Sequence, residues 1–207
     1  MQKIVLASSN QGKLAEFNRL LNNHNMSVVA QGELNVPDAD ETGLTFVENA
    51  ILKARNACAC TGLPAIADDS GLEVDALDGA PGIYSARFSG TGATDQKNNA
   101  YLLEKLKNTP EHARTARYQC ILVFMQHEKD PTPIICQGSW EGRILNAPEG
   151  DGGFGYDPLF WLEQYQCSAA NLPYGKKNHV SHRAIAMQAL LDALNTHPLL
   201  KSQTAKK

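Results

Sequence analysis

The sequence lacks the features that mark a membrane protein, a secreted protein or a repeat protein. Its longest apolar runs are short, as at residues 121–125, so we expect no segment that spans a membrane and no membrane partner. The opening stretch, residues 1–7, is too short for the apolar region of a signal peptide. No internal repeat or low-complexity linker is present. We therefore expect one globular domain over residues 1–207, built as two lobes and ending in a disordered tail at residues 200–207.

An excess of charge of one sign and paired cysteines are missing as well. The chain has 19 Lys and Arg against 22 Asp and Glu, which gives a net charge of −3. A protein that binds nucleic acid through charge alone needs a surplus of basic residues, so no nucleic-acid partner is expected. The 5 cysteines are an odd number without a CxxC pair, which predicts reduced, mostly buried thiols and a cytoplasmic protein.

Segments with the pattern of strands alternate with segments that have the pattern of helices. Strands are expected at residues 3–7, 28–30, 65–67, 117–126 and 134–144. Capping residues predict that helices begin at Ser9 or Asn10, at Thr45, at Thr94 or Asp95, and at Ser181. The last two strands are expected to form an antiparallel hairpin. The strand at 65–67 is expected to end at Asp68-Asp69-Ser70-Gly71, and residues 72–74 are expected to be extended again. This interleaving predicts an α/β fold with a mixed sheet.

Two standard nucleotide-binding motifs are not satisfied. Gly150, Gly152 and Gly155 form a literal GxGxxG, but Pro158 disfavours the helix that a dinucleotide site needs directly after it. No Walker A loop surrounds the Gly-Lys pair at 12–13 or the pair at 175–176.

Two short segments have chemistry suited to an anion or a metal. Ser8-Ser9-Asn10-Gln11-Gly12-Lys13 follows a strand and opens a helix, where free N–H groups and a lysine attract anions. A plain helix cap with a solvated lysine is the more common explanation. Asp68-Asp69-Ser70-Gly71 follows a buried strand, where functional residues of open α/β sheets often lie. Only one of the two aspartates can face a given cleft, and a solvated acidic turn is the alternative.

Four further features have both a functional and a structural explanation. Glu41 precedes a helix start, where acidic residues commonly balance the helix dipole, and Lys53 lies on that helix as an ordinary surface lysine would. Phe154-Gly155-Tyr156-Asp157 places two rings among glycines, where they can stack on a planar base or simply pack. Residues 176–183 form a basic run that enters a helix, as a phosphate site or as a solvated face. In combination, these features describe an Mg²⁺-assisted site for a nucleoside phosphate.

The same residues, in this order, closely resemble the inosine triphosphate pyrophosphatase family. The matching stretches are SSNQGK at 8–13, ETGLTFVENAILKA at 41–54, ADDSGLEVDALDGAPGIYSARFSG at 67–90, GGFGYDPLF at 152–160 and SHRA at 181–184. The resemblance implies a homodimer of two-lobed subunits, each with a long mixed β-sheet, flanking helices and a central cleft. It also implies Mg²⁺-dependent hydrolysis of non-standard purine triphosphates (ITP, dITP, XTP) to monophosphate and pyrophosphate, which keeps deaminated purines out of DNA and RNA.

The resemblance also implies a role for each matching residue. The triphosphate is expected to bind Ser8, Ser9, Asn10, Gln11, Gly12 and Lys13. Glu41 and Asp69 are expected to organise Mg²⁺, with Asp69 as the base that activates water, and Asp68 and Lys53 in the same catalytic group. The substrate is expected to contact Ser70, Phe154, Gly155, Tyr156, Asp157, Lys177, His182 and Arg183. The family pattern changes at 163–175, which leaves Lys176 open as an alternative to Lys177, although the spacing to Ser181 favours Lys177.

Three other functions remain as alternatives. A related pyrophosphatase for modified pyrimidine nucleotides shares the opening SSN…K, but the FGYD and SHR segments argue against it. A nucleotide sensor without catalysis needs no general base, so Glu41, Asp68 and Asp69 disfavour it. A Nudix hydrolase is disfavoured because no Arg-Glu-x-x-x-Glu-Glu helix is visible.

Overall fold

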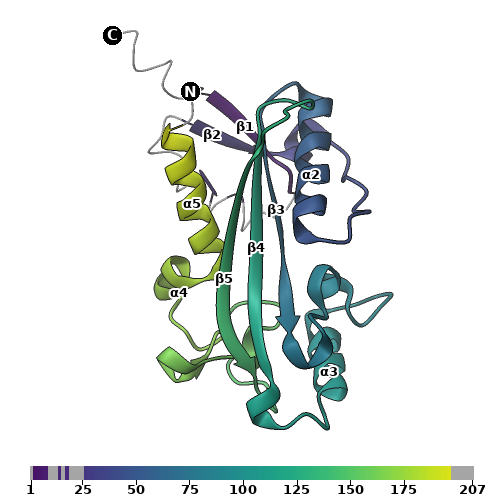
Figure 1. The fold of residues 1–207 in the computed structure, drawn as a ribbon, viewed down its shortest axis with the longest axis vertical. Helices are drawn as coiled ribbons and strands as arrows, with labels where there is room; N and C mark the ends of the chain where they lie inside the picture. The colour runs from purple at the N-terminus through teal and green to yellow at the C-terminus, as the bar shows by residue number, and fades with distance from the viewer. Residues whose placement is uncertain (1, 9–13, 15–16, 19–25, 197–207) are drawn as a thin grey trace. The chain divides into compact units, whose positions relative to one another are not determined.

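A seven-stranded mixed sheet forms the centre of the fold. The computed structural model describes residues 2–8, 14, 17–18 and 26–196 (Figure 1). The strands are β1 (Gln2–Leu6), β2 (Met26–Ala30), β3 (Ala65–Val74), β4 (Thr115–Met125), β5 (Ile134–Ile144), β6 (Phe160–Leu162) and β7 (Cys167–Ser168). Their order in the sheet is β2-β1-β3-β4-β5-β6-β7. β1 is parallel to β2 and β3, whereas β6 is antiparallel to β5 and β7, so the prediction of an α/β fold with a long mixed sheet is confirmed.

The α-helices with described bounds are α2 (Phe46–Thr61), α3 (Asp95–Lys105), α4 (Tyr174–Val180) and α5 (His182–Thr196). Of these, α2, α3 and α5 begin where the capping residues predict. Thr45 and Glu48 form a reciprocal capping box before α2, Thr94 caps α3, and Ser181 Oγ accepts the N–H of Ala184 at the start of α5. The short helix α4 has no counterpart in the sequence prediction. The expected helix start at Ser9 or Asn10 and the tail at 200–207 lie outside the described residues.

The break expected at Asp68-Asp69-Ser70-Gly71 is wrong. The strand at 65–67 and the extended segment at 72–74 are one strand, β3, which runs for ten residues from Ala65 to Val74. Alternating burial returns after the two aspartates, with Leu72 and Val74 fully buried, and β4 lies beside β3 as its neighbour in the sheet. Sheet pairing and the burial of the second half therefore outweigh the local preference of Asp-Asp-Ser-Gly for a turn.

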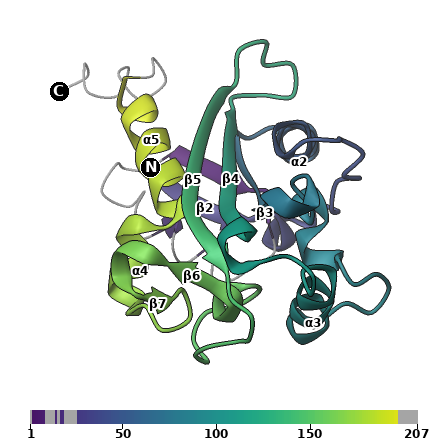
Figure 2. The same cartoon turned by 60° about the horizontal axis from the view of Figure 1, so that its bottom comes forward.

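The described chain divides into two compact units. Unit 1 contains residues 1–69, 121–137 and 186–207, and unit 2 contains residues 70–120 and 138–185. In unit 1, small side chains of α2 such as Ala50 and Ala54 pack with strand residues such as Val5 and Ala67. In unit 2, residues of α3 share a core with those of β6 and of the strands beside it, and Figure 2 shows β6, β7 and α4 of this unit. The predicted lobes with a cleft between them stay a prediction.

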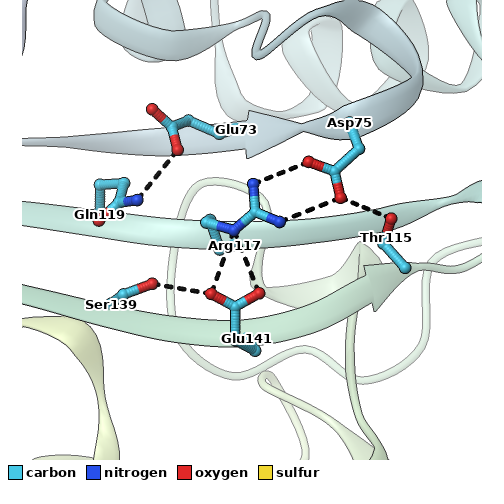
Figure 3. A network of polar contacts seen from close by, with 7 residues as sticks. All are labelled: Glu73, Asp75, Thr115, Arg117, Gln119, Ser139 and Glu141. Atoms are coloured by element: carbon cyan, nitrogen blue, oxygen red, sulfur yellow. Dashed lines mark hydrogen bonds and ion pairs between the residues drawn. The ribbon is translucent and has the colours of Figure 1, made fainter.

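Polar side chains cross the strands of unit 2 in a row (Figure 3). Arg117 on β4 donates to both carboxylate oxygens of Asp75 at 2.8 and 3.0 Å, and its Nε lies 3.1 Å from both oxygens of Glu141 on β5. Gln119 donates to Glu73 on β3 at 3.0 Å. The hydrogen bonds from Arg117 and Thr115 hold the pKa of Asp75 below its usual value. These cross-strand contacts add a modest stabilisation to the row, because its ends are exposed to solvent.

No helix in the described part of the chain combines the length and the apolar character needed to cross a membrane.

Candidate active site

Three of the predicted catalytic and metal-binding residues meet in unit 1. Lys53 projects from α2, Glu41 lies in the loop before that helix, and Asp69 lies on β3. The Nζ atom of Lys53 is 2.6 Å from Asp69 Oδ1 and 3.3 Å from Glu41 Oε1. The structure therefore places a lysine between two carboxylates that are 28 residues apart in the sequence (69 − 41).

The segment that carries Glu41, residues 35–45, is held by two asparagine side chains of α2. Asn49 Oδ1, in the first turns of α2, accepts the N–H of Gly43 at 2.9 Å. A Cβ atom on Gly43 would lie 2.8 Å from that oxygen, so glycine permits the close approach. Asn56 donates to the carbonyl of Pro37 at 2.8 Å. Because α2 carries Lys53 as well, one helix positions both the lysine and the loop that carries its acidic partner.

The charges at this site are unevenly balanced. Burial alone lowers the pKa of Lys53, but attraction to Asp69 and the hydrogen bond between them, with Glu41 and Asp68 nearby, raise it overall. Burial raises the pKa of Asp69, and although Lys53 opposes this, the negative Glu41 and Asp68 raise it further. The pKa of Lys53 is raised because three carboxylates stabilise its charged form. Around Asp69, one cation stabilises the charged form, whereas two other carboxylates and burial destabilise it. Among the described residues, the buried Asp69 Oδ2 has no hydrogen-bond donor.

A cavity of ≈ 330 Å³ adjoins this group within unit 1. Its lining includes Glu41, Lys53, Asp68 and Ser8. Asp68 is thus the aspartate among the residues that line the cavity, while Asp69, its neighbour along the strand, binds Lys53. The remaining predicted phosphate-binding residues, at 9–13, lie outside the described residues, and Ser70 follows on β3 as a half-buried residue.

The predicted base-binding residues are grouped in unit 2 around the turn at residues 153–157, which we call the aromatic turn. Asp157 is 3 % exposed, and its Oδ2 accepts the N–H of Phe154 at 3.0 Å and forms an ion pair with Lys177. The ring of Phe154 is 63 % exposed, with Lys177 Nζ 5.4 Å from its centroid. Tyr156 points into the core, where its hydroxyl donates to the carbonyl of Ser85 at 2.8 Å. The turn therefore buries its carboxylate and one ring and presents the other ring to solvent.

Helix α3 anchors the other side of the aromatic turn. The N–H of Gly155 donates to Asp95 at 2.7 Å, and its carbonyl accepts from Asn99 at 2.9 Å. A second cavity, of ≈ 460 Å³, is lined by these α3 residues and by the glycines and Phe154 of the loop. Sequence reasoning did not single out Asp95 or Asn99 as contacts of the turn; only the helix cap near Asp95 was visible.

The basic segment enters the same unit. His182 is buried, and its ring stacks on Tyr118 of β4 at a centroid distance of 4.8 Å and an interplanar angle of 10°. Arg183 follows it as a half-buried residue at the start of α5. Of the two neighbouring lysines, Lys177 contacts the aromatic turn, whereas Lys176 lies 4.2 Å from the ring centroid of Tyr165.

Among the described residues, no cluster of three or more His, Cys, Asp or Glu side chains is arranged to hold a metal ion. Mg²⁺ commonly takes only one or two carboxylates and completes its shell with water and substrate phosphates. Glu41, which lines the cavity, and Asp69, one oxygen of which has no donor among the described residues, are two carboxylates of unit 1 that could hold such an ion.

Comparison with known proteins shows the class of fold first and then the family. A HAM1 protein from Coxiella burnetii matches with a TM-score of 0.92 and 47 % identity, covering 95 % of this chain and 100 % of that one. The Staphylococcus aureus Ham1 protein matches with a TM-score of 0.87 and 38 % identity, covering 94 % and 98 %. A dITP/XTP pyrophosphatase from Shigella flexneri is 58 % identical over 194 residues, which are 94 % of this chain and 98 % of that protein.

The Ham1 family model matches residues 4–193. The chain belongs to the Ham1 family, and the resemblance drawn from its motifs is confirmed.

Proposed function

We propose that this protein hydrolyses dITP, XTP and ITP to the nucleoside monophosphate and pyrophosphate. The relative named dITP/XTP pyrophosphatase supports this over nearly the whole chain. The observation that carries the proposal is Lys53 held between Asp69 and Glu41 beside a cavity, because a cation among carboxylates suits a polyanionic substrate that binds with a metal ion. By removing deaminated purine triphosphates, the enzyme would keep these bases out of DNA and RNA.

The phosphate chain is assigned to unit 1. Ser8 lines the cavity, and the segment that follows it, Ser9-Asn10-Gln11-Gly12-Lys13, supplies hydroxyl, amide and ammonium groups for the triphosphate. Lys53 then exchanges part of its contact with the carboxylates for a phosphate oxygen. Its raised pKa keeps it protonated for this role.

Asp69 and Glu41 are the proposed ligands of Mg²⁺. When bound, Mg²⁺ would neutralise phosphate charge and make a coordinated water more acidic. Asp69 accepts the proton of the attacking water, whose oxygen bonds to the α-phosphorus as the bond to the β-phosphate oxygen breaks and pyrophosphate leaves. Asp68, which borders the cavity, is proposed to assist. Ser70 is proposed to contact the substrate next to this group.

The purine base is assigned to the aromatic turn of unit 2. Phe154 supplies an exposed ring for stacking, and Gly155 and Tyr156 shape the turn, the latter from the core side. Asp157, Lys177, His182 and Arg183 are proposed to read the edge of the base. The first two form an ion pair at the aromatic turn, and the other two begin α5. A donor directed at the 6-keto oxygen of hypoxanthine or xanthine would be left unpaired by the 6-amino group of adenine, which supplies the discrimination.

The finer features of the family resemblance are proposals as well. We propose a single catalytic domain of two lobes, a homodimer in solution and a cytoplasmic location. All five cysteines are free thiols, and such thiols fit a reducing compartment.

Release of pyrophosphate tests the proposed function. The protein is mixed with Mg²⁺ and with ITP, dITP, XTP, ATP, GTP, dUTP or dTTP, and both pyrophosphate and orthophosphate are measured. Fast release of pyrophosphate from the three non-standard purines, with the monophosphate as co-product, is the expected result. Faster turnover of dUTP or dTTP would show a pyrimidine enzyme instead, and ITP binding without any hydrolysis would show a sensor.

A further inference from the structure

Tyr118 contacts two of the predicted base-binding residues at once, although it lies in none of the family-like motifs. It is on β4 and only 8 % exposed. Its hydroxyl donates to Asp157 Oδ1 at 3.4 Å, and its ring is stacked nearly parallel on the ring of His182. One side chain thus connects the aromatic turn with the segment that begins α5.

The hydroxyl donates to the oxygen of Asp157 that neither the turn nor Lys177 contacts. Asp157 Oδ2 is taken by the N–H of Phe154 and by Lys177. Oδ1 points to Tyr118, so the three contacts together determine how the carboxylate is rotated. Burial and the negative charge of Asp157 raise the pKa of Tyr118 well above its usual value, so the phenol keeps its proton and remains a donor across the physiological range.

The ring of Tyr118 sets the plane of the imidazole. His182 lies against it at 4.8 Å, and Trp140 extends the stack, with its ring 6.4 Å from the imidazole and inclined by 20°. Phe160 packs on the same two aromatic residues at 4.7 and 5.6 Å. In such a stack, the imidazole can move within its plane far more easily than it can tilt, so its nitrogen atoms are kept in one plane.

We propose that Tyr118 is a positioning residue for base recognition, which orients Asp157 through its hydroxyl and His182 through its ring. This inference rests on the proposed function, because it explains how the proposed site would select among purine bases. Tyr118 itself touches no part of the substrate. It fixes the orientation of Asp157 in the aromatic turn and of His182 in α5, so that both side chains face the base in a defined geometry.

Two substitutions separate the two roles of the side chain. Tyr118→Phe removes the hydroxyl and keeps the stack, whereas Tyr118→Leu removes both. The control is Tyr165→Phe, which removes a hydroxyl from a ring packed against the same core, in a residue assigned no role in binding. Binding of IMP and AMP is measured by calorimetry, so the readout does not depend on catalysis. Thermal unfolding of each variant is recorded alongside.

Tyr118→Phe is expected to lower the preference for IMP over AMP by roughly three- to tenfold, the effect of one hydrogen bond to a buried acceptor. Tyr118→Leu is expected to lower it further, and Tyr165→Phe to leave it unchanged. A purely structural role would weaken both nucleotides equally, so an unchanged IMP/AMP ratio in Tyr118→Phe overturns the inference, as does a wild type without any preference for IMP. If IMP is preferred but ITP releases no pyrophosphate, the proposed function fails while the positioning role is still decided by the ratio.

Discussion

Gly153→Ala would insert a methyl group where the carboxylate of Asp157 already lies. Gly153 has φ +74°, and a Cβ atom built on it would be 2.0 Å from Asp157 Oδ2. That oxygen cannot simply turn away, because it accepts the N–H of Phe154 and pairs with Lys177 in a position that is almost fully buried. The substitution therefore has to break at least one of these contacts or move the backbone of the aromatic turn.

Gly155→Ala is the matched control for this change. Gly155 also has a positive φ, +61°, but a Cβ atom there would meet nothing within 4 Å. Both substitutions carry the cost of a left-handed backbone for alanine, about 1–2 kcal/mol. Gly153→Ala adds the loss of a hydrogen bond to a buried charged group, about 1.5–3 kcal/mol. For a chain of this size, the added loss corresponds to a Tm that is roughly 3–12 °C lower than that of Gly155→Ala.

Thermal and urea unfolding of both variants measure the difference directly. Binding of IMP is recorded for Gly153→Ala as well, since displacement of Asp157 should weaken it. Binding of inorganic tripolyphosphate, which has no base, should stay unchanged. The reasoning is refuted if Gly153→Ala is no less stable than Gly155→Ala, because the close approach to Asp157 then has no energetic consequence.

Three other changes have defined outcomes. Asp69→Asn should leave ITP binding nearly intact and lower kcat by about 10²–10⁴-fold, as expected for loss of a general base; a kcat close to that of the wild type would remove Asp69 from this role. Phe154→Ala should weaken ITP binding by about 1–3 kcal/mol and leave tripolyphosphate inhibition unchanged, and equal losses for both would contradict stacking. Asp75→Asn should cost about 0.2–1 kcal/mol at pH 7, because the pair with Arg117 is partly exposed. Since the folded-state pKa of Asp75 is lowered, this stabilisation is present above the unfolded pKa of about 3.9 and is lost as the pH falls through the folded value. Urea unfolding of the wild type and of Asp75→Asn at pH 7 and near pH 3 measures this stabilisation. If the difference in unfolding free energy between the two proteins were the same at both pH values, the lowered pKa of Asp75 would be contradicted.

Local signals in the sequence predict the helix starts well. The capping box of Thr45 and Glu48 is a contact between residues three positions apart, so the pattern alone contains the geometry that the structure shows. Thr94 and Ser181 are of the same kind. Strands with strong apolar character, such as β4 and β5, were located to within two residues for the same reason: the burial pattern is repeated along each segment.

The unbroken course of β3 through residues 68–71 could not be predicted from local preference, although residues 72–74 were expected to be extended. Asp68-Asp69-Ser70-Gly71 favours a turn when taken alone, yet the neighbouring strand and the buried Leu72 keep the segment extended. The consequence reaches the site, because an extended backbone sends Asp68 and Asp69 in opposite directions. Alternation predicted that the two aspartates would differ, but only the structure shows that Asp69 binds Lys53 while Asp68 borders the cavity.

The residue types of Glu41, Lys53 and Asp69 indicate what chemistry they can perform, but they do not predict that the three side chains lie close together. The sequence separations within this group are 12 and 16 residues, and no periodicity connects a loop, a helix and a strand. The family resemblance indicated that these residues belong to one site. The structure shows in addition that a single lysine pairs with two carboxylates, so negative charge is in excess. That asymmetry leaves a buried carboxylate oxygen without a donor among the described residues, which is the strongest local reason to assign a cation to this place.

The apolar pattern of β4 gives no sign of the polar contact that Tyr118 makes. In β4 it occupies a position that the alternation assigns to the core, and a buried apolar ring satisfies that pattern completely. The hydroxyl is what the pattern leaves unexplained, because a buried phenol needs a hydrogen-bond partner. The hydroxyl of Tyr156 donates to a backbone carbonyl, that of Ser85. The hydroxyl of Tyr118 donates instead to the side chain of Asp157, 39 residues away. A buried tyrosine in a core strand therefore predicts that some polar group must approach it, and here that group is the carboxylate around which the aromatic turn is built.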